Sequence, residues 1–153
     1  MTKTVEQTIE IDRSVDEVWK VLVDFQSHAE WDPFIRNISR KPQVGEKLKV
    51  HITPMGKRGM KFNPVVTDAT APSELAWKGK LGIRGLFDGA HRFSLIAVEK
   101  QHTRLTQSET FSGILVGLFG ATLDATEEGF AQMNAALKQR CESPGRAKSE
   151  TTS

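Results

Sequence analysis

The chain has 153 residues, a length typical of one domain, and a formal net charge of only +2 at pH 7. Lys and Arg do not occur in runs of five or more, so the sequence lacks the basic segment that is typical of a nucleic-acid-binding protein. A single cysteine excludes a disulfide framework and a cysteine-based zinc site. The charged N-terminus is unlike a signal peptide, and no apolar run reaches the roughly 18 residues that a membrane span needs. We therefore expect a cytoplasmic protein without stable membrane insertion.

The N-terminal third predicts a strand, a helix and a short elbow. Residues 4–12 alternate between apolar and polar, which predicts a strand. Ser14 and Glu17 form a capping box at the start of an amphipathic helix over 15–23. Residues 24–33 are a second short helical turn, which Pro33 ends.

The middle of the chain predicts antiparallel strands. Period-two alternation returns and persists in five segments, 47–53, 60–67, 75–81, 87–97 and 105–111. Pro64 cannot donate a hydrogen bond to a ladder, so we expect an edge position or a bulge there. The short connections, including a turn over 54–59, favour an antiparallel meander.

The C-terminal part returns to helical periodicity. An apolar face runs from Leu115 to Cys141, and three glycines within it indicate close backbone approach or open space beside the helix. Residues 144–153 contain nothing to bury and predict a disordered tail. We therefore expect one folded domain over residues 1–143.

Four short segments resemble a known family. They are Ser14–Trp19 at the first helix, Trp31–Phe34 at the elbow, Gly85–Phe93 in the sheet and Gly129–Lys138 in the last helix. Their order over residues 4–142 resembles the START-like (Bet v 1-like) superfamily, in its polyketide cyclase/dehydrase and lipid-transport branch. The resemblance implies an α+β helix-grip fold. A curved antiparallel sheet of about seven strands would hold a long C-terminal helix, with two short N-terminal helices and an apolar cavity. This fold hosts cyclases, carriers, receptors and co-chaperones, so it does not by itself assign a function.

One pair of residues is the candidate for chemistry. If the last hairpin turns at residues 99–101, His91 lies opposite Glu109 and Phe93 lies opposite Gln107, all on the inward face. An imidazole beside a carboxylate in an apolar cleft can act as a general base or orient a ligand. The alternative is a satisfied polar pair that only sets the strand register.

The remaining candidate ligand contacts are mainly aromatic. Large apolar side chains on inward positions either line a cavity or pack the core. Together with the polar candidates, the set is Trp31, Phe62, Trp77, Phe87, His91, Phe93, Gln107, Glu109, Phe111, Phe119 and Leu123. Lys57, Arg58 and Arg84 lie in loops that either rim the cavity or are simply solvated, and Asp88 and Arg92 could pair on the outer face.

The sequence predicts neither a metal site nor a cofactor. The four histidines lack metal-ligand spacing, and no GxSxG or GxGxxG motif is present. We expect a binder or carrier of a small hydrophobic molecule of lipid, polyketide, aromatic or isoprenoid type. One alternative is a polyketide cyclase or dehydratase that uses His91 and Glu109, and another is a protein-interaction module. The ligand's identity and the oligomeric state stay open.

Overall fold

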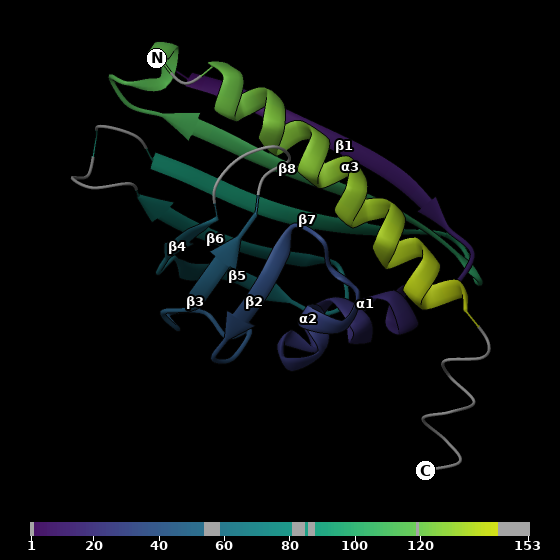
Figure 1. Ribbon diagram of the computed structural model, residues 1–153. Coiled ribbons are helices and arrows are strands. Elements are labelled where there is room, and N and C mark those ends of the chain that lie inside the picture. The colour runs from purple at the N-terminus through teal and green to yellow at the C-terminus, as the bar shows by residue number, and fades with distance from the viewer. Residues whose placement is uncertain (1, 54–58, 81–84, 86–87, 119, 144–153) are drawn as a thin grey trace.

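The computed structural model describes residues 2–53, 59–80, 85, 88–118 and 120–143 (Figure 1). The predicted tail (144–153) and most of the predicted turn (54–58) lie outside the described residues. The elements, in chain order, are β1 (Thr2–Ile11), α1 (Val15–Val23), η1 (Phe25–Ser27), α2 (His28–Trp31), β2 (Ile35–Ser39), β3 (Lys49–Ile52), β4 (Met60–Phe62), β5 (Val65–Thr70), β6 (Glu74–Lys80), β7 (Asp88–Glu99), β8 (His102–Ser112), η2 (Val116–Leu118) and α3 (Gly120–Glu142).

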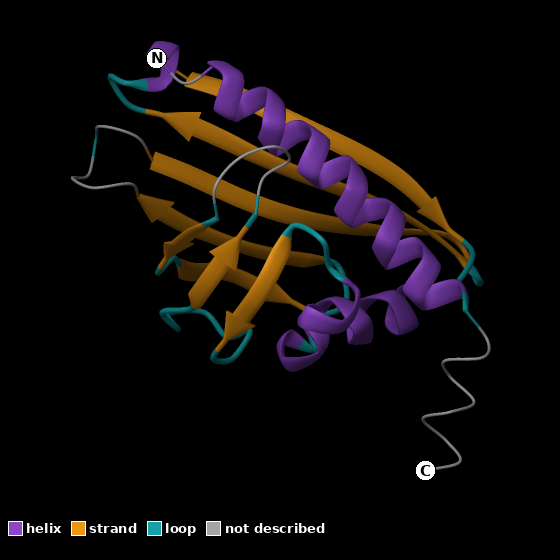
Figure 2. Cartoon of the chain, viewed as in Figure 1, coloured by secondary structure: helices purple, strands orange, loops and turns teal. Residues whose placement is uncertain are grey.

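The strands form two antiparallel sheets that are covered by helices on one side. The larger sheet has the order β1-β8-β7-β6-β5 and the smaller one the order β2-β3-β4, and a bridge between Lys47 and Val65 links them. The larger sheet curves, and α3 lies across its face, while α1 and α2 lie near the C-terminal end of α3 (Figure 2). This arrangement confirms the predicted α+β helix-grip class.

The hairpin of β7 and β8 has the predicted register. Its turn lies at residues 100 and 101, which places His91 opposite Glu109 and Phe93 opposite Gln107. Phe93 and Gln107 are fully buried. Strand alternation together with hairpin length was therefore sufficient to place these four residues on one inward face.

The close approach expected of the glycine-rich C-terminal helix occurs at Gly129. A Cβ atom at this position would overlap the ring of Phe34, which follows the elbow. Phe34 in turn packs edge-on against Phe130, with ring centroids 5.4 Å apart. At Gly120, by contrast, a Cβ atom would meet no atom within 4 Å.

The elbow is held by a buried contact between an aspartate and a histidine. Asp32 accepts hydrogen bonds from the backbone N–H groups of Phe34 and Ile35, each at 2.9 Å, and lies 3.0 Å from His28 Nδ1. His28 Nε2 donates to the carbonyl of Leu22 at 2.7 Å, because a carbonyl can only accept. Asp32 and His28 therefore connect the end of α1 to the start of β2.

Pro64 interrupts the predicted strand over 60–67. The chain forms β4 and β5 on either side of it, and Asn63 Nδ2 donates to the carbonyl of Leu48 at 3.1 Å. Proline has no N–H to continue a ladder, and its own carbonyl accepts from Leu48 N at 2.8 Å. The break turns the chain from the smaller sheet to the larger one.

The predicted outer pair of Asp88 and Arg92 was wrong. Arg92 Nη1 instead contacts Glu74 at 2.6 Å and Asp68 at 3.1 Å, and Asp88 accepts from the backbone N–H of Gly85 at 3.0 Å. Residues four apart on one strand are about 13 Å apart, whereas neighbours across strands are much closer. Arg92 therefore pairs across strands.

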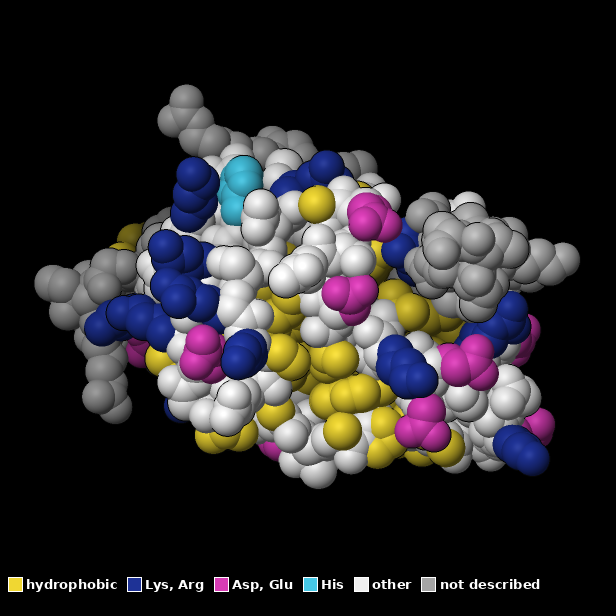
Figure 3. Space-filling view, turned by 90° about the horizontal axis from the view of Figure 1, so that it is seen from below, with side chains coloured by type: hydrophobic (Ala, Val, Ile, Leu, Met, Phe, Trp, Pro, Cys, Tyr) yellow, Lys and Arg dark blue, Asp and Glu magenta, His cyan; other side chains and the backbone are white. Residues whose placement is uncertain are grey.

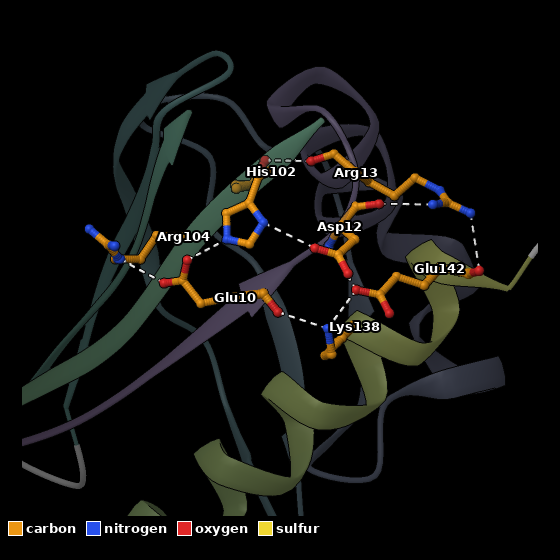
Figure 4. A network of polar contacts seen from close by, with 8 residues as sticks. Glu10, Asp12, Arg13, His102, Arg104, Lys138 and Glu142 are labelled. Atoms are coloured by element: carbon orange, nitrogen blue, oxygen red, sulfur yellow. Dashed lines mark hydrogen bonds and ion pairs between the residues drawn. The ribbon is translucent and has the colours of Figure 1, made fainter. Parts of the chain in front are cut away.

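A polar network ties the ends of β1 and β8 to the C-terminal turn of α3 (Figure 4). His102 contacts Glu10 at 2.5 Å and Asp12 at 3.0 Å. Lys138 Nζ donates to the Glu10 carbonyl at 3.0 Å and contacts Glu142 at 2.6 Å. The network holds the C-terminal turn of α3 against the larger sheet.

Candidate functional site

An apolar pocket lies where β4 faces the larger sheet and α3. Its volume is about 90 Å³, small for a ligand site. Six elements contribute to it, and the described residues that line it are Ile52, Met60, Lys61, Phe62, Trp77, Gly79, Lys80, Gly89, Glu109, Phe111 and Thr126. The pocket therefore lies between the sheet and the helix, at the end where β4 is.

Glu109 is the one carboxylate among the described lining residues. Its Oε1 lies 3.3 Å from His91 Nδ1. The Glu109 side chain is 17% exposed, whereas that of His91 is 4% exposed and does not line the pocket. A bound molecule would thus meet the carboxylate directly, and the imidazole only through it.

A chain of hydrogen bonds determines that the Nε2 atom of His91, the ring nitrogen that does not face Glu109, carries a hydrogen. Asn134 Nδ2 donates to the Gln7 carbonyl at 3.1 Å, so its Oδ1 must accept, and Gln107 Nε2 donates to it at 2.8 Å. Gln107 Oε1 is then free to accept from His91 Nε2 at 3.0 Å. The backbone carbonyl of Gln7 therefore sets the tautomer of His91, with hydrogen on Nε2.

This tautomer decides what the pair can do. With hydrogen on Nε2, the contact between Nδ1 and Glu109 is a hydrogen bond only if one further proton lies between them. That proton either belongs to the carboxyl group or makes the imidazole cationic. Glu109 can therefore accept a proton or a hydrogen bond from a molecule in the pocket while His91 compensates its charge.

His91 is held rigidly by aromatic rings. It stacks on Trp77 with ring centroids 5.0 Å apart and an interplanar angle of 27°. Phe93 and Phe130 lie at 4.6 and 4.9 Å. Because Phe130 comes from α3, the helix closes the site from the side opposite the sheet.

The structure brings together four of the residues predicted as ligand contacts and separates others. Phe62, Trp77, Glu109 and Phe111 line the pocket. Phe93, Gln107 and Leu123 are buried and do not line it, because they pack the core or join the polar chain. The predicted contacts Phe87 and Phe119 lie outside the described residues, as do Lys57, Arg58 and Arg84.

Trp31, another predicted ligand contact, is not among the described residues that line this pocket. It packs against His28 with ring centroids 4.7 Å apart, and it lines a separate hollow with Glu30 and Arg140 near the end of α3. Its predicted role in ligand binding stays a prediction.

Several pocket residues were missed by sequence reasoning. Lys61 and Lys80 occupy polar positions of alternating strands, which normally face water, yet both reach the pocket because it lies at the sheet margin. Gly89 lines it too, and a Cβ atom there would overlap Glu109 Oε2. A glycine in the interior of a predicted strand was the available signal for such a close approach.

Other chemistries find little support in the part of the chain that the structure describes. No group of three or more His, Cys, Asp or Glu side chains there could hold a metal ion. Burial raises the pKa of the Cys141 thiol to about 12, so it is not a nucleophile at neutral pH. Among the described helices, none is both long enough and apolar enough to cross a membrane.

Comparison with known proteins identifies the family. The family model described as polyketide cyclase / dehydrase and lipid transport matches residues 2–142, nearly the whole chain. The chain belongs to this family. The predicted START-like resemblance is thereby confirmed. No curated protein matches the chain in sequence.

Solved structures show the same fold at low identity. A START superfamily protein from Mycobacterium smegmatis has a TM-score of 0.74 at 18% identity, over 91% of this chain and 97% of that one. The Zhui aromatase/cyclase from Streptomyces sp. R1128 has a TM-score of 0.72 at 15% identity, over 93% and 94%. Norcoclaurine synthase from Thalictrum flavum gives the same four values. These likenesses establish the helix-grip fold, and the family fits hydrophobic ligand binding or a cyclase-type activity.

Proposed function

We propose that this protein binds a small hydrophobic molecule that carries a hydrogen-bond donor. The apolar body would lie against Phe62, Trp77 and Phe111, and the donor would meet Glu109. The observation that carries the proposal is that Glu109, the one carboxylate among the described lining residues, contacts a buried imidazole. The rest of the described wall is mainly apolar, with Lys61, Lys80 and Thr126 as its other polar members. Apolar burial would supply the driving force, at roughly 25 cal/mol per Å², and the carboxylate would select orientation.

The small volume of the pocket shapes the expected ligand. About 90 Å³ holds only part of a lipid or polyketide, so the bound molecule would extend past the rim or displace rim side chains. Met60 and Phe62 are half-buried residues on the short strand β4, which pairs only with β3 within the described sheets. They are the side chains best placed to move.

A pocket-filling substitution tests binding. Met60→Trp places a bulky ring in the pocket, and Ile96→Trp places the same ring on the outer face of β7, where Ile96 is 56% exposed. Binding of 2-naphthol and octanol would be measured by calorimetry. We expect both to bind the parent protein and the Ile96→Trp variant but not the Met60→Trp variant. Equal binding by all three proteins, or by none, would overturn the proposal.

The contact between Glu109 and His91 favours a second candidate, a cyclase or dehydratase of polyketide type. An ionised Glu109 could remove an acidic C–H proton from a carbon between two carbonyl groups, and the resulting enolate carbon could then attack a second carbonyl of the same molecule. The proton would stay on Glu109 until it returned to product. His91 would act as a positioning residue, because it does not reach the pocket.

Isosteric substitution separates this candidate from simple binding. Glu109→Gln keeps the shape of the side chain and removes the base, so turnover of a poly-β-carbonyl substrate would disappear while the substrate still binds. Gln107→Leu would lower turnover by removing the hydrogen bond that orients His91, although residue 107 does not line the pocket. Its effect should appear in kcat rather than in KM, with a shifted pH profile. Full turnover in Glu109→Gln would rule out this chemistry.

A further inference from the structure

A second hollow adjoins the apolar pocket. Its volume is about 680 Å³, and it shares Lys61, Phe62, Gly79 and Lys80 with the pocket. It forms where the pairing of β5 with β6 begins, at Val65 and Lys78, so that Gly79 and Lys80 lie beyond the last paired residue of β5. Phe62 packs on Gly79, where a Cβ atom would lie 3.3 Å from its ring. Phe62 is thus the wall between the two spaces.

The hollow is strongly cationic. Lys47, Lys61, Lys78 and Lys80 line it and are exposed, while Asp88 is its one carboxylate among the described lining residues. Both carboxylate oxygens of Asp88 accept from the backbone N–H of Gly85, at 3.0 and 3.3 Å. Lys and Arg side chains also crowd the left part of the face seen in Figure 3, at the end of the molecule where β4 and the end of β6 lie.

Several other cations of the molecule have carboxylate partners. Arg13, Arg92, Arg104, Lys138 and Arg140 each contact a carboxylate. Within the described residues, none of the four lysines of the hollow has such a partner. Four like charges around one concavity repel one another, and an anion placed among them would relieve that repulsion.

We propose that the ligand is an amphipathic anion, whose apolar part enters the pocket and whose carboxylate or phosphate group lies in the hollow. This inference rests on the proposed binding function and specifies its ligand class. Lys61 and Lys80 line both spaces, so they would contact the anionic group of a molecule that passes Phe62. Charge-assisted hydrogen bonds from ammonium groups to such anions are among the stronger polar contacts.

A matched ligand series tests the charge requirement. Octanoate, octyl phosphate, octanol and octylammonium share one apolar chain and would be titrated by calorimetry at about 20 mM salt, where screening is weak. We expect the two anions to bind at least about ten-fold more tightly than octanol. Octylammonium, which the lysines repel and Glu109 attracts, reports on the Glu109 contact instead. Octanoate is less hydrophobic than octanol, so apolar burial alone would produce the opposite order. Whether octanoate or octyl phosphate binds more tightly distinguishes a carboxylate from a phosphate ligand.

Paired substitutions locate the anion site. Lys61→Gln with Lys80→Gln should abolish the preference for anions, so that octanoate and octanol bind this variant with similar affinity. Lys20→Gln with Lys100→Gln removes the same charge at exposed positions outside the hollow and should leave the preference intact. Equal affinity of the parent protein for octanoate and octanol, or an equal loss in both variants, would overturn the inference while leaving the pocket's binding function standing. If no member of the series binds, the proposed binding function fails and this inference fails with it.

Discussion

Gly89 provides the space into which the Glu109 carboxylate points. The two residues lie on neighbouring strands, β7 and β8, and a Cβ atom at residue 89 would overlap Glu109 Oε2. The carboxylate can therefore lie beside His91 only because residue 89 has no side chain. This relationship places a titratable group in the pocket wall and makes a glycine part of the candidate site.

The first prediction follows from this contact. Gly89→Ala should displace the Glu109 carboxylate and weaken ligand binding or turnover as much as Glu109→Gln does. Its cost to stability should be only about 1 kcal/mol, because the displaced atom is the end of a flexible side chain. Calorimetric binding and urea unfolding measure the two effects. Gly120→Ala, at an open position, is the control that should leave binding unchanged.

The second prediction concerns the buried polar chain. Gln107→Leu leaves His91 Nε2 and Asn134 Oδ1 without partners, and Asn134→Leu leaves Gln107 Nε2 and the Gln7 carbonyl without theirs. Each should cost about 1–3 kcal/mol in the free energy of unfolding. The double variant has fewer unpaired groups than the two single variants combined, so its cost should be smaller than their sum by about 0.5–3 kcal/mol.

A double-mutant cycle in urea measures this coupling. Thr8→Val and Thr106→Val remove a hydrogen bond of 3.1 Å at an exposed position of the same sheet. Each of these two substitutions should change the free energy of unfolding by no more than about 0.5 kcal/mol. If the stability losses of the Gln107 and Asn134 variants were strictly additive, the two residues would not belong to one continuous chain of hydrogen bonds.

The third prediction concerns the elbow. Asp32→Ala removes the acceptor for the Phe34 and Ile35 N–H groups and leaves His28 buried without its partner. The expected cost is about 3–5 kcal/mol in the free energy of unfolding. Asp24→Ala removes an exposed carboxylate whose one side-chain hydrogen bond within the described residues comes from Ser27 Oγ, and it should cost about 0.5 kcal/mol. Similar unfolding midpoints for the two variants would show that the buried pair does not hold the elbow.

The fourth prediction concerns pH. Hydrogen bonds to Glu10 and then Asp12 raise the pKa of His102 above 6.5, and hydrogen bonds from Arg104 and then His102 lower the pKa of Glu10 below 4.5. The stabilisation from His102 is thus fully present below pH 6.5 and is lost as pH rises through its raised pKa. The stabilisation from Glu10 is present above pH 4.5 and is lost as pH falls through its lowered pKa.

Thermal unfolding at a series of pH values tests this sign. The parent protein should lose stability between about pH 6 and pH 9 relative to His102→Gln, because only the parent loses a proton from this network. The difference should shrink at high salt, since the network is at the surface. If the difference in unfolding temperature between the two proteins stays constant over this pH range, the protonated imidazole of His102 does not stabilise the fold.

Local patterns were sufficient to predict the faces of the strands and much of the hairpin register. His91, Phe93, Gln107 and Glu109 alternate with residues of the outer face, and a short turn leaves one register that places all four on the inward face. The period of α3 likewise predicted its buried face, which includes Phe130 and Leu137. These features depend on neighbours that are near in sequence, or on one short hairpin.

Contacts between distant elements decided the rest. Lys61 and Lys80 come from separate hairpins, and only the crossing of β4 over the end of β6 brings both to one rim. Trp31 follows the elbow to another surface, and the orientation of Gln107 depends on Asn134 of α3. By itself, the sequence determined the fold class and the inward set of residues, because periodicity records which side of an element avoids water. The tertiary structure alone decided which inward residues meet the pocket, because β4, the end of β6 and α3 come together only in the folded chain.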